Sequence, residues 1–344
     1  MKFSIIGCGN IAKKHVHCIK NLPGASLVGF SDIDPEILIS SKKIWDAPGF
    51  LEYNEMINVT NPDVVVVLTS SGSHASIVKS ISPLVSRIIV EKPLSLRIDD
   101  ATQMIDSCKQ NDTQLSVVKQ NRFNLPITYI KKLIEEKAFG KIFLGSIRMR
   151  WSRSQEYYDS AEWRGTWKHD GGVLANQGIH FVDMIQWLMG DVESVFAQSI
   201  NASLNIEAED TLVSTVKFKN GALATFEFTT ATQPKDIEGS ISILGTKGTA
   251  SIGGFAMNKL DYLETVNGIN NEDLIKFQIN PNDFAYAHEA FYKAYLDSSN
   301  PHSSFVACGE EGMKSLKIIH AMYQSVELNK EIKVDTVKPS KLGI

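Results

Sequence analysis

Short apolar runs alternate with amphipathic stretches over residues 1–120. This pattern is typical of buried parallel strands joined by crossover helices. We therefore expect an open, mostly parallel sheet in this part of the chain. The predicted strands cover residues 2–7, 26–31, 64–68, 87–90 and 114–118, and the predicted helices cover 10–20, 35–45, 74–82 and 97–110.

The pattern changes after about residue 140, where longer segments alternate apolar and polar positions. Such alternation is typical of antiparallel strands with one buried face, and Asn220-Gly221 and Thr246-Lys247-Gly248 predict hairpin turns. The predicted strands cover 141–151, 192–201, 210–218, 222–231, 238–245 and 248–253. Helices are expected at 173–189, 283–297 and 310–328, with a short last strand at 331–335.

The composition is that of an ordinary globular protein of 344 residues, with 43% hydrophobic and 22% charged residues. A net charge of −4 without long basic runs argues against a nucleic-acid surface as the main function. The apolar runs are too short to cross a membrane, and we expect no signal peptide. Four scattered cysteines without metal-ligand spacing suit a reducing cytoplasm, so we predict a cytoplasmic protein without a bound metal.

A glycine motif follows the first predicted strand. Gly7-Cys8-Gly9-Asn10-Ile11-Ala12 satisfies G-x-G-x-x-A between an apolar strand and an amphipathic helix, the context in which the motif binds a dinucleotide. Gly7 allows a tight turn, Gly9 lets the backbone approach the pyrophosphate, and Ala12 packs the helix on the strand. The alternative is a glycine turn in some other strand–helix unit.

Asp32 ends the second apolar run, where an acidic residue accepts hydrogen bonds from the adenosine ribose hydroxyls. No basic residue follows before Lys42, so a 2′-phosphate would meet Asp32 and Asp34 without a partner. This favours NAD over NADP. The alternative is that the two aspartates only cap the next helix.

These observations predict an α/β fold in two domains. Residues 1–122 form an NAD-binding Rossmann domain. Residues 123–344 form an α/β domain built on a large, mostly antiparallel sheet.

Glu91-Lys92-Pro93 places a lysine directly after the fourth predicted strand. Ligands bind at the carboxyl ends of strands in open α/β sheets. A lysine there can donate to a substrate hydroxyl and stabilise the alkoxide that forms as a hydride leaves. The alternative is an ordinary surface lysine.

A polar stripe marks the helix predicted at 173–189. Asn176, His180 and Asp183 are spaced four and three residues apart, which places them on one helical face that should look into a cavity or solvent. His180 can take a proton from a hydroxyl near neutral pH. The alternative is a structural histidine with satisfied hydrogen bonds.

The order G-x-G-x-x-A, E-K-P and G-x-H-x-x-D, followed by an open-faced sheet, resembles the Gfo/Idh/MocA family of NAD(P)-dependent oxidoreductases over essentially the whole chain. The resemblance implies that Lys92 and His180 lie beside the nicotinamide and the sugar carbon that is oxidised. Many family members carry aspartate four residues before the histidine. This chain has Asn176 there, which leaves His180 as the stronger candidate base.

Two further stretches, residues 119–122 and 155–167, are similar to those of bacterial dehydrogenases that oxidise carbon 3 of UDP-N-acetylglucosaminuronic acid in O-antigen (lipopolysaccharide) synthesis. Such a substrate carries a diphosphate and a carboxylate, which arginine forks bind well. The alternative is that the arginines pair with surface acids. The arginines of this region are Arg122, Arg148, Arg150, Arg153 and Arg164.

We therefore predict an NAD-dependent sugar-nucleotide dehydrogenase with Lys92 and His180 as catalytic residues. The resemblance implies that residues 123–344 bind the substrate and carry the subunit contacts of a homotetramer or homodimer. It also implies a 3-keto product, with 2-oxoglutarate as a possible hydride acceptor. One rival is a dehydrogenase of a free sugar, inositol or glycoside, and another is a non-catalytic NAD(H)-binding regulator. The predicted cofactor contacts are Gly7, Gly9, Asn10, Ile11, Ala12, Asp32, Ile33, Ser70, His74, Glu91, Lys92 and Gln120. The predicted substrate contacts are Lys92, Arg122, Tyr157, Arg164, Trp167, Asn176 and His180.

Overall fold

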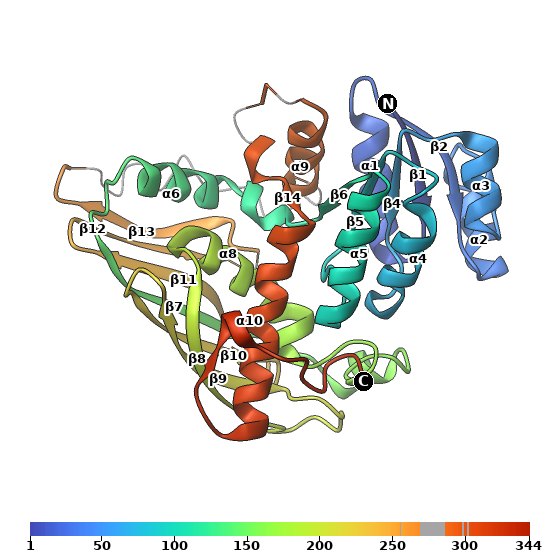
Figure 1. Ribbon diagram of the computed structural model, residues 1–344. Helices are drawn as coiled ribbons and strands as arrows, with labels where there is room; N and C mark the ends of the chain where they lie inside the picture. The colour runs from blue at the N-terminus through green and yellow to red at the C-terminus, as the bar shows by residue number, and fades with distance from the viewer. Residues whose placement is uncertain (255, 269–285, 298, 301–302) are drawn as a thin grey trace. The chain divides into compact units, whose positions relative to one another are not determined.

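The computed structural model describes residues 1–254, 256–268, 286–297, 299–300 and 303–344 (Figure 1). The chain forms two compact units, one of residues 1–120 with 284–313 and one of residues 121–283 with 314–344. The sequence prediction divides the chain once, at residue 122. Each unit instead contains two segments, because the chain returns to the first unit after building most of the second.

The first unit is built on a parallel sheet of the Rossmann type, with strand order β14-β6-β5-β4-β1-β2-β3 (Figure 1). These strands are continuous apolar runs because both faces of the sheet are covered. The strand β4, for example, is buried along its whole length. Only β14 runs antiparallel, where it pairs with β6. The strands are β1 (Lys2–Ile6), β2 (Ser26–Ser31), β3 (Gly49–Phe50), β4 (Val64–Val67), β5 (Arg87–Val90), β6 (Gln114–Val117) and β14 (Ala307–Cys308).

Helices cover both faces of this sheet. The order of the strands reverses between β1 and β4, so right-handed crossovers place α1 on one face and α4 and α5 on the other. The helix α9 packs against α1. The helices are α1 (Asn10–Asn21), α2 (Pro35–Lys42), α3 (Tyr53–Thr60), α4 (His74–Ile81), α5 (Ile98–Gln110) and α9 (Tyr286–Leu296). Residues 283–285 of the predicted helix 283–297 lie outside the described residues.

The second unit contains an eight-stranded sheet of order β13-β12-β11-β7-β10-β9-β8-β15. It is mostly antiparallel, as predicted, and β7 and β10 form a parallel pair. Both predicted hairpins are confirmed, at Asn220-Gly221 between β9 and β10 and at residues 246–247 between β11 and β12. The strands are β7 (Ile142–Arg150), β8 (Val192–Ile200), β9 (Thr211–Phe218), β10 (Leu223–Thr229), β11 (Glu238–Gly245), β12 (Gly248–Gly253), β13 (Lys259–Thr265) and β15 (Ile332–Lys333).

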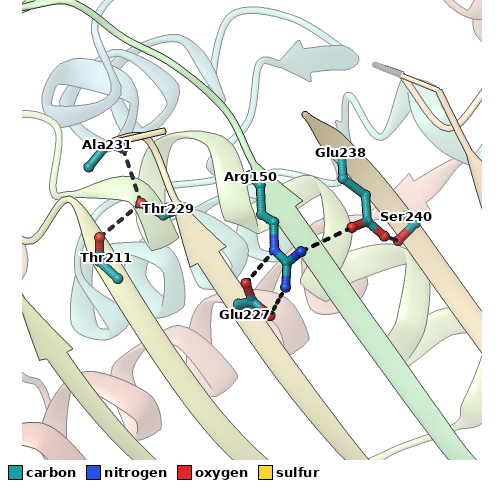
Figure 2. A network of polar contacts seen from close by, with 7 residues as sticks. All are labelled: Arg150, Thr211, Glu227, Thr229, Ala231, Glu238 and Ser240. Atoms are coloured by element: carbon teal, nitrogen blue, oxygen red, sulfur yellow. Dashed lines mark hydrogen bonds and ion pairs between the residues drawn. The ribbon is translucent and has the colours of Figure 1, made fainter. Parts of the chain in front are cut away.

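The two faces of this sheet differ in character. Along β10, Ala224, Phe226 and Phe228 point to the buried face, against which α8 (Ile179–Met189) packs. The alternate positions of β10 point to the open face, where Glu227 accepts both hydrogen bonds of the Arg150 fork. Figure 2 shows this arginine between Glu227 and Glu238, on three neighbouring strands. The helix α8 and the arginine network therefore lie on opposite faces of the sheet.

Several elements of the second unit were not predicted. The strand β13 and the helices α6 (Leu125–Glu135) and α7 (Gln155–Asp159) are additional, and the predicted helix 173–189 begins with a π-helical turn, Leu174–Gly178, before α8. The last long helix is α10 (Gly309–Leu328). Over the described ranges, no helix combines the length and the apolar character that a membrane span requires.

Candidate active site

The glycine loop has the geometry that the motif predicts. Gly7 has a φ of +96°, and a Cβ there would lie 2.9 Å from the backbone of Leu68 and Thr69, so a side chain is excluded. A Cβ on Gly9 would meet nothing within 4 Å, which leaves open space above the loop. Gly9 also precedes α1 without a capping side chain. The first turn of α1 can therefore present the backbone N–H groups of Asn10 and Ile11 to a pyrophosphate, while the Ala12 N–H donates to the Gly9 carbonyl.

Asp32 is held beside this loop and stays partly exposed. Its Oδ2 accepts from the Cys8 N–H at 2.7 Å, and its Oδ1 accepts from the Asp34 N–H at 2.9 Å. Each carboxylate oxygen keeps a second lone pair for a ribose hydroxyl. Asp34, in contrast, caps α2 through the N–H groups of Glu36 and Ile37. The two aspartates therefore differ in function. Asp34 caps α2, and Asp32 is placed to bind the adenosine ribose.

Some of the remaining predicted cofactor contacts have exposed side chains, and others are buried. Ile33 is 88% exposed and Ser70 is exposed at the start of the segment before α4. The Oε1 atom of Gln120 is buried without a hydrogen-bond partner among the described residues. His74 is buried, and its two ring nitrogens lie 2.9 Å from the Pro93 carbonyl and 3.1 Å from the Thr69 carbonyl. Burial lowers the pKa of His74. These contacts favour a positioning role for the His74 side chain, and its contact with the cofactor stays a prediction.

Lys92 follows β5 in a turn that contains a cis bond to Pro93. It is the single partly exposed side chain in an otherwise buried stretch from Ile88 to Leu96. The neighbouring carboxylate of Glu91 is buried, and its Oε2 accepts from the Lys92 N–H at 2.9 Å. The buried Glu91 carboxylate thus fixes the backbone of this turn, while the Lys92 side chain stays partly exposed.

Two histidines lie beside the Glu91 carboxylate, and a tyrosine hydroxyl lies beside one of them. His15 on α1 lies 3.0 Å from its Oε1 and 2.7 Å from the Tyr292 hydroxyl, and His288 Nε2 lies 3.8 Å from the same Oε1. Burial alone would raise the pKa of Glu91, but the interactions with His15 and His288 hold it well below its usual range. Burial lowers the pKa of His288 to about 4.

The side chains of His15, Glu91 and His288 are of types that can also bind a metal, and their ligand atoms lie within 4.8 Å of one another. Both oxygens of Glu91 already accept hydrogen bonds from protein groups. This favours a hydrogen-bonded anchor for the Lys92 turn. These contacts support a structural role for the Glu91 side chain, and the contact of this residue with the cofactor stays a prediction.

In the second unit, the start of α8 carries the predicted polar stripe. Asn176 and His180 are partly exposed, while nearly all of their neighbours from Gly171 to Gln186 are buried. Asp183 departs from the prediction, because its side chain is only 3% exposed and accepts two hydrogen bonds from Arg122, at 2.8 and 2.9 Å. The exposed stripe therefore consists of Asn176 and His180 alone.

Asn176 is tied to the loop before it. Its side-chain amide donates to Oδ1 of the buried Asp170 at 2.5 Å, and Oδ2 of the same carboxylate accepts from the Gly165 N–H at 2.8 Å. Gly165 has a φ of +69°, and a Cβ there would contact Ile206 at 2.9 Å. One aspartate thus joins the segment Trp163–Trp167 to the turn that carries Asn176.

That segment also organises the predicted substrate residues. The Arg164 guanidinium lies 4.3 Å from the Tyr157 ring centre and 4.6 Å from that of Trp163, and it donates to the Tyr157 hydroxyl at 2.7 Å. Its Nε is buried without a hydrogen-bond partner among the described residues. Trp167 donates through Nε1 to the Glu207 carbonyl and packs edge-on against Tyr323.

The other arginines have partners within the protein, and their contact with a substrate stays a prediction. The Arg122 side chain is 2% exposed and is held by Asp183, which favours a structural role over the predicted substrate contact. Arg148 and Arg150 pair in register with Glu227 and Glu238 on the open face of the sheet, away from α8. Arg153 lies 3.5 Å from Asp236. The acidic partners and the sheet geometry that hold these arginines are not visible in the local sequence.

Comparison with known proteins agrees with this geometry. Residues 1–119 match the family model described as "Oxidoreductase family, NAD-binding Rossmann fold", and residues 127–251 match the "GFO/IDH/MocA C-terminal domain". The chain belongs to the Gfo/Idh/MocA family. It is an NAD-dependent oxidoreductase of the dehydrogenase type, as the sequence predicts.

Among solved structures, this Gfo/Idh/MocA protein is similar to the WlbA dehydrogenase of Chromobacterium violaceum in complex with NADH and UDP-GlcNAcA. The two are 35% identical with a TM-score of 0.90, over 97% of this chain and 95% of the other. The WlbA dehydrogenase of Bordetella pertussis, in complex with the same two molecules, is 33% identical with a TM-score of 0.89, over 97% of each chain. The myo-inositol 2-dehydrogenase of Thermotoga maritima is 26% identical over 98% of this chain and 99% of its own length.

The two predicted catalytic residues of this Gfo/Idh/MocA enzyme lie in different units, Lys92 in the first and His180 in the second. Their joint action on one substrate stays a prediction. The residues present fit NAD, because the glycine loop is open above Gly9 and Asp32 is fixed beside it. Gly7 to Ala12 would hold the pyrophosphate and Asp32 the adenosine ribose.

A carboxyl group that sequence analysis missed supports the start of the π-helical turn. Glu209 is buried, and its Oε1 accepts from the Leu174 N–H at 3.0 Å and from the Tyr323 hydroxyl at 2.9 Å. Its Oε2 has no hydrogen-bond partner among the described residues. Burial raises the pKa of Glu209 to about 7. No local signal marks it, because its partners lie 35 and 114 positions away.

The raised pKa makes stability depend on pH. The stabilisation from protonated Glu209 is fully present below its unfolded pKa of 4.5 and is lost as the pH rises through about 7. We expect Glu209→Gln to match wild type near pH 4.5 and to exceed its free energy of unfolding by about 3 kcal/mol above about pH 8, because an amide cannot ionise. Urea unfolding across this pH range checks it, and parallel curves for the two proteins would contradict it.

Asp170 was also missed as a site residue, although a signal was present. It directly precedes Gly171-Gly172, a turn that leads into the helix with Asn176 and His180. An aspartate before such a turn commonly binds nearby backbone or side-chain donors. The sequence pattern could therefore have indicated a side chain that holds the start of this helix.

Proposed function

We propose that the protein oxidises the 3-hydroxyl of UDP-N-acetylglucosaminuronic acid to a 3-keto sugar in lipopolysaccharide O-antigen synthesis. The observation that carries this proposal is the similarity, at 33–35% identity over nearly the whole chain, to two WlbA dehydrogenases in complex with UDP-GlcNAcA. Relatives such as the myo-inositol and D-apiose dehydrogenases are less similar, at 24–26% identity.

The reaction needs a proton acceptor and a hydride acceptor. NAD, when bound, accepts the hydride from the sugar carbon. His180 removes the hydroxyl proton through a ring nitrogen, and Lys92 donates a hydrogen bond to that oxygen and stabilises its developing negative charge. As the C–H electron pair leaves as hydride, the C–O bond becomes a ketone and the proton remains on the protein.

Arg164 is the best placed arginine to hold the uronate or a phosphate. It is partly exposed, it lies between Tyr157 and Trp163, and it has no carboxylate partner among the described residues. The N–H of the next residue, Gly165, donates a hydrogen bond to Asp170, and the Asn176 amide donates to the same carboxylate. A charge-assisted contact to a carboxylate contributes about 1.5–3 kcal/mol. This contact would favour the uronate over the neutral sugar.

We expect UDP-N-acetylglucosaminuronic acid to lose two hydrogens when it is incubated with enzyme, NAD and 2-oxoglutarate. UDP-N-acetylglucosamine and myo-inositol should keep their masses, because they lack the uronate. Mass spectrometry of the sugar checks this, and deuterium at carbon 3 of the uronate should be lost with the reaction. Since NADH can stay bound and pass its hydride to 2-oxoglutarate, free NADH is not the measured quantity.

A matched control is Lys219→Met, which removes an exposed lysine paired with Asp335. This variant should oxidise the uronate as wild type does. Equal oxidation of both nucleotide sugars, or oxidation of myo-inositol alone, would reject the proposed substrate and favour the free-sugar alternative.

The proposed assembly is a cytoplasmic homotetramer or homodimer that associates through the open face of the large sheet. Large apolar side chains occupy that face beside the Arg150 network: Leu144 is 37% exposed, Val213 47% and Leu223 55%. A sheet face of this character is usually covered in a stable assembly. Sedimentation of wild type against Leu223→Lys would test it, because a charge there should dissociate the subunits.

A further inference from the structure

We propose that Asp170 is a positioning residue that acts through Asn176 on His180, by fixing which end of the Asn176 amide faces the histidine. This rests on the proposed function, because it assigns the support of the predicted base. The contacts that carry it all lie in the second unit: the two donors on Asp170, and the shared exposed side of the turn that carries Asn176 and His180.

The first step is the hydrogen-bond inventory of Asp170. A carboxylate has two oxygens and only accepts, whereas an amide has one accepting oxygen and one donating nitrogen. Both Asp170 oxygens are in use, Oδ2 by the Gly165 N–H and Oδ1 by the Asn176 Nδ2. Asp170 can therefore accept from the NH₂ end of Asn176 and cannot pair with its carbonyl oxygen.

The second step follows from the orientation of the amide. With Nδ2 directed at Asp170, the Oδ1 of Asn176 is left as an acceptor on the other side of the amide. His180 lies four residues later, on the same partly exposed side in both π-helical and α-helical geometry. That carbonyl oxygen can accept from a ring N–H of His180, which fixes the tautomer and leaves the other ring nitrogen to take the substrate proton.

The third step is the burial of the pair. Asp170 is 6% exposed and Asn176 is flanked by buried residues on both sides, so water does not readily replace a lost hydrogen bond. The Gly165 bond also fixes Asp170 to the segment with Arg164. Asp170 therefore coordinates the orientation of the base with the position of the predicted substrate arginine.

The test exchanges the two polar groups. In Asp170→Asn, the new amide has one acceptor for two donors, so Asn176 must rotate and turn its NH₂ end toward His180. We expect kcat to fall about tenfold and KM to change little. In wild type, Nδ2 of Asn176 lies 2.5 Å from Oδ1 of Asp170. In Asn176→Asp two carboxylates meet at this place and repel each other, so kcat should fall at least as far. In the double variant the amide at position 170 again matches both partners, and kcat should return to within about threefold of wild type.

A second readout does not depend on the substrate. The pKa of His180, measured by NMR of histidine-labelled protein, should fall by about half a unit or more in Asp170→Asn and return to or above the wild-type value in the double variant. Asp335→Asn, an exposed acid paired with Lys219, is the matched control and should change neither quantity.

The outcomes separate this inference from the proposed function. The positioning role is rejected if Asp170→Asn leaves both kcat and the His180 pKa unchanged. It is also rejected if the double variant has a kcat as low as those of the two single variants. If no tested sugar is oxidised by wild type, the proposed function fails, and the His180 pKa in the three variants still decides the role of Asp170.

Discussion

Turnover is expected to fall about 100-fold or more in both Lys92→Met and His180→Asn, while NADH binding stays nearly intact. Lys92 is the partly exposed member of a turn whose neighbours are buried, and His180 is the ionisable member of the partly exposed pair Asn176 and His180. Removing a positioned charge stabiliser or base costs this much when chemistry limits the rate. Single-turnover assays and NADH titration measure the two quantities.

Matched controls are Lys79→Met and His17→Asn, which alter exposed residues elsewhere on the first unit. Both controls should turn over as wild type does. If the Lys92 and His180 variants also retain wild-type turnover, these side chains are structural and the NAD(H)-binding regulator becomes the better interpretation. If NADH binding is lost as well, the fall in turnover does not report on the chemical step, and the assignment is not supported.

A loss of about 3–5 kcal/mol in the free energy of unfolding is expected for Arg122→Met, measured by urea unfolding without substrate. The substitution leaves the Asp183 carboxylate buried without its fork, and an uncompensated buried charge is costly. The Arg122 guanidinium also lies 5.1 Å from the centre of the Trp187 ring, a contact that the variant loses.

The matched comparison is Arg122→Met combined with Asp183→Leu. Because both charges are then removed, most of the lost stability should return. If Arg122 were only a substrate contact, the single variant would unfold at the wild-type urea concentration. The double variant would then be the less stable of the two, through the loss of Asp183 alone.

Most elements of the first unit could be predicted because their pattern is local, whereas β3, α3 and β14 were not predicted. Apolar runs buried on both faces identify β1, β2, β4, β5 and β6, and the Gly7 loop carries its own conformational requirement in the missing Cβ. Alternation along β9 and β10 likewise reflects one covered and one open face. These signals depend on neighbours a few residues away, so the sequence displays them directly.

The partners of the charged side chains could not be predicted in the same way. Arg122 meets Asp183 across 61 positions, and Arg150 meets Glu227 across 77. Such pairs are set by how the helices and strands pack, and nothing in a local window distinguishes an arginine that pairs internally from one that binds a ligand. The π-helical turn was missed because its apolar spacing also fits an α-helix.

The two-segment composition of the first unit has a consequence for how it forms on the ribosome. When residue 120 has been synthesised, the edge of β6 still lacks β14, and Glu91 has only one of its two histidines. Tyr292, which completes the contact with His15, is made after most of the large sheet. The nucleotide-binding unit therefore reaches its final form late in translation. His288 and Tyr292, which complete the hydrogen-bonded anchor of the Lys92 turn, are synthesised only after most of the chain.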